Sequence, residues 1–208
     1  KKAMWYGAQV AEAIHKYGPD YGFDVTVNKF DWSTLVKNRQ AYISRIHASY
    51  DRVLGNNQVT LLKGYAKFVN NTTVEVDGEQ YTAPHILIAT GGKPFRPDIP
   101  GAEFGIDSDG FFELDEQPRR VAVVGGGYIG VELAGVLHAL GSETHSILRQ
   151  ELPLRGFDAM LQETLKTLML EEGIDIHEKT EINQVTKLDN GDLELALTNG
   201  NTLTVDCL

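Results

Sequence analysis

Residues 119–155 read RRVAVVGGGYIGVELAGVLHALGSETHSILRQELPLR, and this stretch decides the fold. A short apolar run, VAVV, leads directly into Gly125, Gly127 and Gly130, and a helix is expected to follow. In such a strand–turn–helix unit the first glycine permits a tight turn, the second lets backbone approach a pyrophosphate, and the third lets helix and strand pack closely. The helix N-terminus then offers N–H donors and the positive end of its dipole to phosphates. The motif and its context therefore predict a dinucleotide site.

The residues after the second expected strand indicate which dinucleotide binds. An NAD-specific unit usually presents Asp or Glu about 20 residues after the glycines, where the carboxylate accepts hydrogen bonds from the ribose 2′-OH. Here Arg149 ends the second strand and Arg155 lies on the following loop. Guanidinium groups bind a 2′-phosphate through charge-assisted hydrogen bonds worth about 1.5–3 kcal/mol each, whereas a carboxylate would repel it. The sequence therefore predicts NADP(H), although Glu151 between the arginines counts against it.

Composition excludes several classes of partner. The chain has 208 residues, 42% of them hydrophobic, and a formal net charge of −10, which disfavours nucleic acid and anionic membrane surfaces. Cys207 is the only cysteine, so no intrachain disulfide can form, and a reducing compartment, the cytoplasm, is expected. The six histidines show no metal-ligand spacing, so no metal is expected; they are His15, His47, His85, His138, His145 and His177.

Hydrophobic periodicity divides the rest of the chain into helices and strands. Helices are predicted over residues 2–17 and 33–54. A β-meander follows and leads into HILIAT, residues 85–90, a continuous apolar run expected to be a parallel strand covered on both faces. After the glycine unit, an amphipathic helix is predicted over about 158–172, followed by a second meander. The residues of that helix predicted to face inward are Met160, Leu161, Leu165, Leu168 and Met169.

The two meanders occupy the same place in two successive units. The first leads into HILIATGG, and the second leads into VDCL, where the sequence stops. This internal repeat predicts a chain cut at both ends. The expected fold class is α/β and Rossmann-like, with parallel sheets and β-meanders in two incomplete nucleotide-binding domains.

Several motifs together carry a family resemblance. They are KKAMW at 1–5, APHILIATGGKP at 83–94, GIDSDGFF at 105–112, GYIGVELAG at 127–135 and LRGFD at 154–158. With these motifs the chain resembles the flavin disulfide reductases over essentially its whole length, and among them the glutathione reductases, especially bacterial forms. The resemblance implies the later part of an FAD-binding domain over 1–115 and an NADPH-binding domain, without its last strand, over 116–208. It implies NADPH-dependent reduction of glutathione disulfide through FAD and a redox-active disulfide, in a homodimer.

The resemblance also implies roles for individual residues. Lys1 matches a lysine beside the flavin, Glu132 the acid that pairs with it, and Tyr128 a tyrosine that gates the nicotinamide site. A cation beside the flavin would stabilise negative charge on its reduced form. The implied NADP contacts are Gly125, Gly126, Gly127, Ile129, Gly130, Glu132, Arg149 and Arg155. The implied FAD contacts are Lys1, Tyr65, Ala66, Thr90 and Gly91, and Tyr50 is the implied glutathione contact.

Other functions stay open at this point. The arginines disfavour dihydrolipoamide dehydrogenase, which uses NAD, but do not exclude mercuric or trypanothione reductase; Tyr50 and the whole-length similarity favour glutathione. A different class is an NADP(H)-binding module without redox chemistry. The redox cysteines and the acid/base histidine of the family lie outside this sequence, and Cys207 cannot replace a disulfide. The 208-residue chain alone is therefore expected not to turn over.

Overall fold

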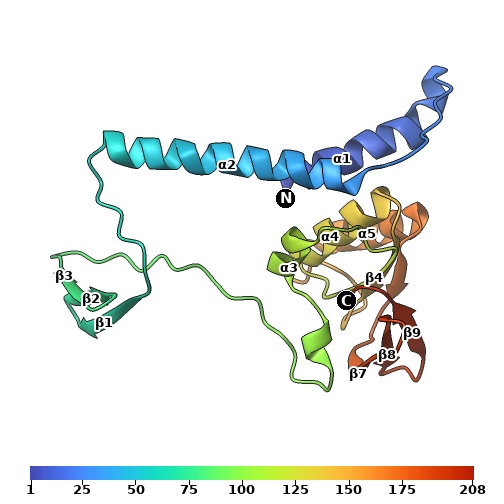
Figure 1. The fold of residues 1–208 in the computed structure, drawn as a ribbon. Helices are drawn as coiled ribbons and strands as arrows, with labels where there is room; N and C mark the ends of the chain where they lie inside the picture. Colours follow the sequence, from blue (N-terminus) through green and yellow to red (C-terminus); the bar gives the residue numbers. More distant parts are fainter. The chain divides into compact units, whose positions relative to one another are not determined.

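The computed structural model describes all residues from Lys1 to Leu208, which form two compact units (Figure 1). The first unit consists of Lys1–Arg39 and Pro94–Leu208, and the second consists of Gln40–Lys93. The long helix α2, Trp32–Asn56, begins in the first unit and continues in the second. No helix of the structure combines the length and the apolar character needed to cross a bilayer.

A parallel sheet forms the centre of the first unit. Its strands are β4 (Arg120–Val124), β5 (Glu143–Ile147) and β6 (Asp175–His177), in the order β4-β5-β6. Helix α4 (Tyr128–Ala139) joins β4 to β5, and α5 (Ala159–Glu172) joins β5 to β6. The strand–turn–helix–strand unit predicted from the sequence is therefore confirmed.

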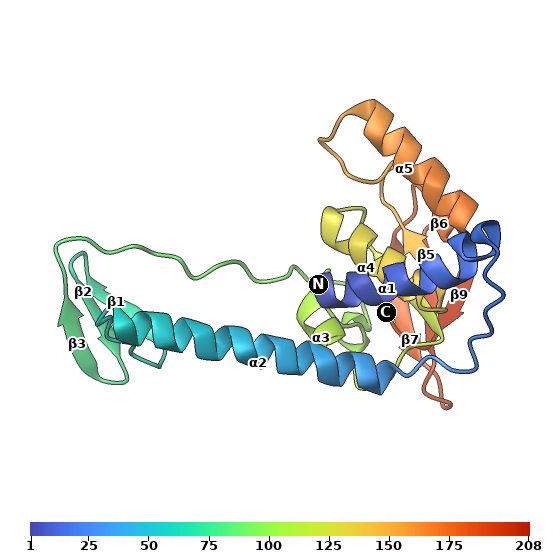
Figure 2. The same cartoon turned by 90° about the horizontal axis from the view of Figure 1, so that it is seen from above.

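Successive side chains of β4 point to opposite faces of the sheet and enter different cores. Val121 packs with Met4 and Ala8 of α1 (Lys2–Glu12) and with apolar residues of α4, and Figure 2 shows α1 running along α4. Ala122 lies in a second core with the apolar face of a β-meander. Burial of each large aliphatic side chain in such cores contributes about 1.5–3 kcal/mol. The first unit therefore has three layers: helices, parallel sheet and meander.

The meander consists of β7 (Ile182–Lys187), β8 (Leu193–Leu197) and β9 (Thr202–Val205), paired antiparallel. Alternate residues of β8 are buried, as expected for a strand with one covered face. After β9 the chain returns to the parallel sheet, where the Ala122 N–H donates to the Cys207 carbonyl at 3.0 Å in a parallel bridge. The second predicted meander is therefore confirmed.

Short helices and caps complete the first unit. The first predicted helix is confirmed, with α1 continuing as a π-helical turn, η1 (Ala13–Tyr17), before the 3₁₀ turn η2 (Pro19–Tyr21). A second 3₁₀ turn, η3 (Ala102–Phe104), precedes α3 (Ser108–Glu113). The Asp107 carboxylate caps α3 by accepting from two backbone N–H groups, and these hydrogen bonds lower its pKa.

The start of α2 is fixed by capping and by a buried cation. Asp31 accepts hydrogen bonds from the Ser33 and Thr34 backbone N–H groups, which cap the helix. The hydrogen bonds that the hydroxyl groups of Ser33 and Thr34 donate to Asp31 lower its pKa. The Arg39 side chain is buried, and its guanidinium donates to the Phe112 carbonyl at 2.7 Å. The helix predicted over 33–54 is therefore confirmed, with its first turns anchored on the segment that contains α3.

The second unit contains a small antiparallel sheet of β1 (Ala66–Asn70), β2 (Thr73–Val76) and β3 (Glu79–Thr82). Asp77 and Gly78 both have positive φ, 49° and 90°, as the tight turn between β2 and β3 requires. The first predicted meander is therefore confirmed.

One prediction about buried apolar faces is wrong, and a second is confirmed only in part. Residues 85–90 form no strand, and Leu87 and Ile88 are 89% and 67% exposed. A central parallel strand needs parallel neighbours for its backbone and cover on both faces, and the second unit offers only antiparallel strands and part of α2. On α5 only Met169 is buried, because the sheet beside this helix ends at the three-residue strand β6. The residues of α5 that were predicted to face inward and are exposed are Met160, Leu161 and Leu168.

Candidate nucleotide-binding site

The glycine turn lies at the carboxyl end of β4. Gly125 has φ +108°, a left-handed conformation that favours glycine, and its N–H donates to the Ile147 carbonyl at 3.0 Å. A Cβ added to Gly130 would lie 2.3 Å from the Gly125 carbonyl oxygen, so no side chain fits there. The first and third glycines of the motif are therefore required by backbone conformation and by close approach.

The turn leaves backbone open to a ligand. A Cβ at Gly125 or Gly127 would meet nothing within 4 Å, so both positions border open space. Gly127 is the N-cap of α4, and no side chain caps this helix end. The first N–H groups of a helix have no intrahelical partner, and here they are also left without a side-chain acceptor. This arrangement fits a pyrophosphate, which would supply the missing acceptors.

The loop after β5 is folded onto the glycine turn. The Leu154 N–H donates to the Gly126 carbonyl at 2.6 Å, and Pro153 is fully buried. Since β4 and β5 are parallel with Val124 opposite Ile147, the loop and the turn share one edge of the sheet. Arg149 and Arg155 lie at the two ends of this anchored loop, and both are exposed.

Neighbouring charges leave the two arginines free to bind an anion. The Arg149 Nε lies 3.7 Å from a Glu181 carboxylate oxygen, and its side chain is 67% exposed, so this ion pair is weak. Glu151, the acid that counted against NADP(H), forms an ion pair with Lys179 at 2.7 Å. The hydrogen bond from Lys179 lowers the pKa of Glu151. Lys179 therefore compensates the charge of Glu151.

Three further residues of the expected site lie together at the N-terminal end of α4. The Lys1 Nζ is 2.7 Å from a Glu132 carboxylate oxygen and 4.6 Å from the centre of the Tyr128 ring. Tyr128 and its neighbour Ile129 are exposed, at 58% and 38%. The ion pair is partly exposed and contributes at most about 1 kcal/mol to stability. Its geometry holds a cation beside an accessible aromatic ring.

The remaining expected site residues belong to the second unit and are not brought together there. Tyr50 lies on α2 and is 64% exposed, and Tyr65 is 96% exposed, directly before Ala66 at the start of β1. Thr90 and Gly91 follow the uncovered apolar run and lie in no helix or strand. No hydrogen bond or ion pair joins these residues.

The structure shows that the only cysteine, Cys207, is largely buried. Burial raises the pKa of the Cys207 thiol to about 11, so it stays protonated at neutral pH.

His145 and His177, 32 residues apart in sequence, approach to 3.3 Å across β5 and β6. Residue spacing did not reveal this pair. The signal that could have found it is the position of each histidine on neighbouring strands of one βαβ unit.

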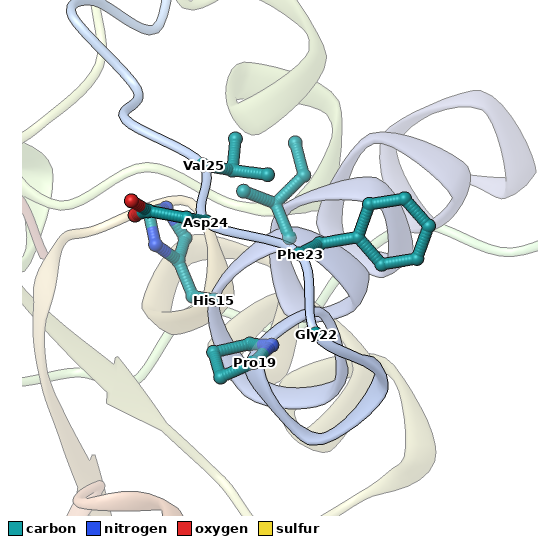
Figure 3. Close-up of a pocket in the computed structure, with 7 residues that line it drawn as sticks. His15, Pro19, Gly22, Phe23, Asp24 and Val25 are labelled. Atoms are coloured by element: carbon teal, nitrogen blue, oxygen red, sulfur yellow. The ribbon is translucent and has the colours of Figure 1, made fainter.

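A shallow hollow of about 420 Å³ lies apart from the glycine turn, at the end of the first helical segment. Figure 3 shows His15 and Asp24 on one side of it and the Phe23 ring pointing to the other. None of the expected site residues lines this hollow. The glycine turn with its arginine loop therefore stays the candidate site.

A parallel βαβ unit whose glycine turn opens a helix toward two arginines defines a dinucleotide-binding protein of the Rossmann type. The family model for pyridine nucleotide-disulphide oxidoreductases matches residues 1–208, so the chain belongs to this family.

Two similar proteins are both named glutathione reductase. The chain is 45% identical over 207 residues to glutathione reductase from Yarrowia lipolytica, covering 93% of this chain and 44% of that protein. It is 44% identical over 217 residues to glutathione reductase from Schizosaccharomyces pombe, covering 100% of this chain and 47% of that protein. The chain thus spans about half the length of these relatives. A solved structure of the HOCl-induced flavoprotein disulfide reductase RclA from Escherichia coli matches 100% of this chain and 44% of its own, with a TM-score of 0.84 and 23% identity, which establishes the fold.

Proposed function

We propose that this chain is the central part of an NADPH-dependent glutathione-disulfide reductase that uses FAD. The observation that carries the nucleotide choice is the loop with Arg149 and Arg155, which is anchored on the glycine turn through the hydrogen bond from Leu154 to Gly126. The identity of 44–45% to two glutathione reductases over 93–100% of this chain supports the substrate.

The residues of the turn fit the pyrophosphate of NADPH. The backbone of Gly125, Gly126 and Gly127 and the uncapped N-terminus of α4 supply donors to it. Ile129 and Glu132 line the same helix start. Arg149 and Arg155 bind the 2′-phosphate through charge-assisted hydrogen bonds, which NADH cannot make.

The Lys1–Glu132 pair and Tyr128 serve the flavin side of the reaction. When bound, NADPH supplies a hydride and FAD passes two electrons on to a disulfide. Lys1 holds positive charge where reduction adds negative charge, and Glu132 holds Lys1 in place across 2.7 Å. Tyr128 is exposed and lies close to Lys1, with 4.6 Å from the Lys1 Nζ to the ring centre, and would gate access of the nicotinamide.

The second unit contributes the remaining contacts of the proposal. Tyr65, Ala66, Thr90 and Gly91 contact FAD, and Tyr50 contacts glutathione disulfide. The domain division that goes with this proposal is an FAD-binding part over 1–115 and an NADPH-binding part over 116–208. The redox-active disulfide and the acid/base histidine come from residues outside this chain, and the complete enzyme is a homodimer in the cytoplasm.

Two alternatives differ in measurable ways. Trypanothione, mercuric and dihydrolipoamide-type reductases share the fold. The first two differ from a glutathione reductase in the substrate that they reduce, and the last differs in its nucleotide. An NADP(H)-binding module would bind the nucleotide and lack flavin and a disulfide. The identity of 44–45% to two glutathione reductases favours a flavoenzyme.

The test is a turnover assay on the complete gene product, purified with its flavin. We expect NADPH oxidation that depends on glutathione disulfide, is much slower with NADH, and is absent with trypanothione disulfide, lipoamide or Hg²⁺ in its place. Flavin absorbance with turnover on one of the other oxidants would move the protein to a sister reductase. A product that binds NADPH and carries no flavin would support the binding module instead.

A further inference from the structure

Four polar side chains gather on one face of the parallel sheet. Glu143 and His145 come from β5, and Asp175 and His177 come from β6. His145 lies opposite Asp175 in the register of the two strands, and residues two apart on a strand share a face. His145 is buried, with 8% of its surface exposed, whereas the Asp175 side chain is 61% exposed. The group is therefore open to solvent from the side of β6.

Three atoms of this group form a nearly regular triangle. The Nδ1 of His145 lies 3.3 Å from the Nε2 of His177 and 3.2 Å from the Oδ2 of Asp175. The third side, from the Nε2 of His177 to the same carboxylate oxygen, is 3.4 Å. Zinc bonds of about 2.0–2.1 Å at tetrahedral angles separate neighbouring ligand atoms by about 3.3–3.4 Å. An octahedral ion with similar bonds would separate them by about 2.8–3.0 Å. The triangle matches three corners of a tetrahedron.

Two acceptor atoms, the Nδ1 of His145 and the Oδ2 of Asp175, face each other when the His145 ring is neutral. The Nε2 of His145 faces a Glu143 carboxylate oxygen at 3.3 Å, and in the tautomer that donates this hydrogen bond Nε2 carries the proton of the ring. The Nδ1 of His145 is then a bare acceptor that faces Asp175, also an acceptor, at 3.2 Å. Two lone-pair atoms at this separation repel unless a positive charge lies between them. Glu143 in turn orients the His145 ring, as carboxylates commonly do for metal-bound histidines.

We propose that His145, Asp175 and His177 bind a zinc ion, with solvent in the fourth position. Two imidazole nitrogens and one carboxylate oxygen suit Zn²⁺, whereas Mg²⁺ and Ca²⁺ take oxygen ligands. The positive charge of the ion compensates Glu143 and Asp175. The nearest cation on β4 is Arg120, which lies opposite Glu143 in the sheet and is bound to Asp192 at 2.7 Å.

The ion fastens the edge strand to the sheet. Strand β6 has three residues and pairs only with β5, so its own hydrogen bonds give limited stability. The residues around it contact the beginning of the arginine loop: the Leu148 N–H donates to the His177 carbonyl at 2.9 Å, and the Thr180 N–H donates to the Leu148 carbonyl at 3.0 Å. Zinc bound between β5 and β6 therefore stabilises the segment from which Arg149 projects.

The test is titration of the metal-free chain Lys1–Leu208 with Zn²⁺ and with Co²⁺ as a spectroscopic probe. We expect one ion per chain, a tetrahedral cobalt spectrum without a thiolate charge-transfer band, and a melting temperature that rises with zinc. His177→Gln should weaken binding by more than about 100-fold, and Glu143→Gln by about 10–100-fold. His47→Gln, which removes an exposed histidine of α2, is the matched control and should bind as the unaltered chain does.

Three results would overturn the proposal: no stoichiometric binding, binding that survives His177→Gln, or an octahedral cobalt spectrum. If His177→Gln does not fold, Asp175→Asn gives the same test with an exposed side chain. These measurements use no flavin and no disulfide substrate, so their outcome is independent of the redox function.

Discussion

The apolar run at residues 121–124 lies between two neighbours, β5 on one side and the Cys207 segment on the other, whereas the run at 85–90 has none. Both runs end in glycines. Val121 and Ala122 are buried on opposite faces of the first, and Leu87 and Ile88 of the second are exposed. The comparison shows that a buried parallel strand depends on its neighbours as much as on its own residues.

The same difference separates the two halves of the proposed site. Around β4, the glycine turn, the arginine loop and the Lys1–Glu132 pair are held by hydrogen bonds and by the two cores. At the end of residues 85–90, the expected FAD contacts Thr90 and Gly91 are exposed and lie in no helix or strand. The nucleotide half is thus organised within this chain, whereas on the flavin side only the Lys1–Glu132 pair is.

The largest expected effect is in hydrogen exchange of the chain Lys1–Leu208. Amides of β4 should exchange at least about a thousandfold more slowly than those of residues 85–90, because only the former are hydrogen-bonded within a packed sheet. Exchange measured by mass spectrometry on overlapping peptides separates the two runs. Equal protection of the two runs would contradict the claim that only β4 is hydrogen-bonded within a packed sheet.

The glycine turn should be the most sensitive part of the nucleotide half. Gly130→Ala places a methyl group against the Gly125 carbonyl at 2.3 Å and should cost about 1–3 kcal/mol of stability and most NADPH binding. Gly127→Ala is the control, since its Cβ meets open space at φ −73°, and should change stability by less than about 0.5 kcal/mol. Denaturant melts measure the stability of both variants, and NADPH titration measures binding by Gly130→Ala. Similar losses of stability for the two variants would show that the turn is not built as described.

The Lys1–Glu132 pair should matter more for electron transfer than for stability. Glu132→Gln in the complete gene product should slow flavin reduction by NADPH more than the later dithiol step, while stability changes by less than about 1 kcal/mol. Stopped-flow absorbance resolves the two half-reactions. A uniform slowing of both would assign Glu132 a structural role only.

The smallest expected effect is the pH dependence of stability that comes from the Arg120–Asp192 ion pair, which joins β4 to the meander. The hydrogen bond from Arg120 holds the pKa of Asp192 below its usual 3.8. A depressed pKa contributes stability that is present above pH 3.8 and is lost as pH falls through the folded-state value. Asp192→Asn should therefore lower the melting temperature at pH 7 and make no difference near pH 2, with Asp189→Asn as a control on the same turn. A difference that persists in acid would mean that the pair acts through packing.

The sequence correctly predicted those elements whose structure depends on residues close together along the chain. The β4–α4–β5 unit and the turn at Asp77–Gly78 follow from glycine conformations and short-range periodicity, and the structure confirms them. The uncovered run at 85–90 and the exposed face of α5 were mispredicted because burial depends on strands and surfaces distant in sequence. The His145–Asp175–His177 triangle was missed for the same reason, since its members meet only across two paired strands. The site roles suggested by the family resemblance stay predictions.

The most direct test of the central claim is the ratio of NADPH to NADH affinity, measured by titration of the complete gene product. Arg149→Gln with Arg155→Gln should weaken NADPH binding by about a hundredfold or more and leave NADH nearly unchanged. Arg45→Gln with Arg52→Gln, which removes two exposed arginines of α2, should leave both affinities unaltered. Equal loss of both nucleotides in the first variant would contradict the assignment of this loop to the 2′-phosphate.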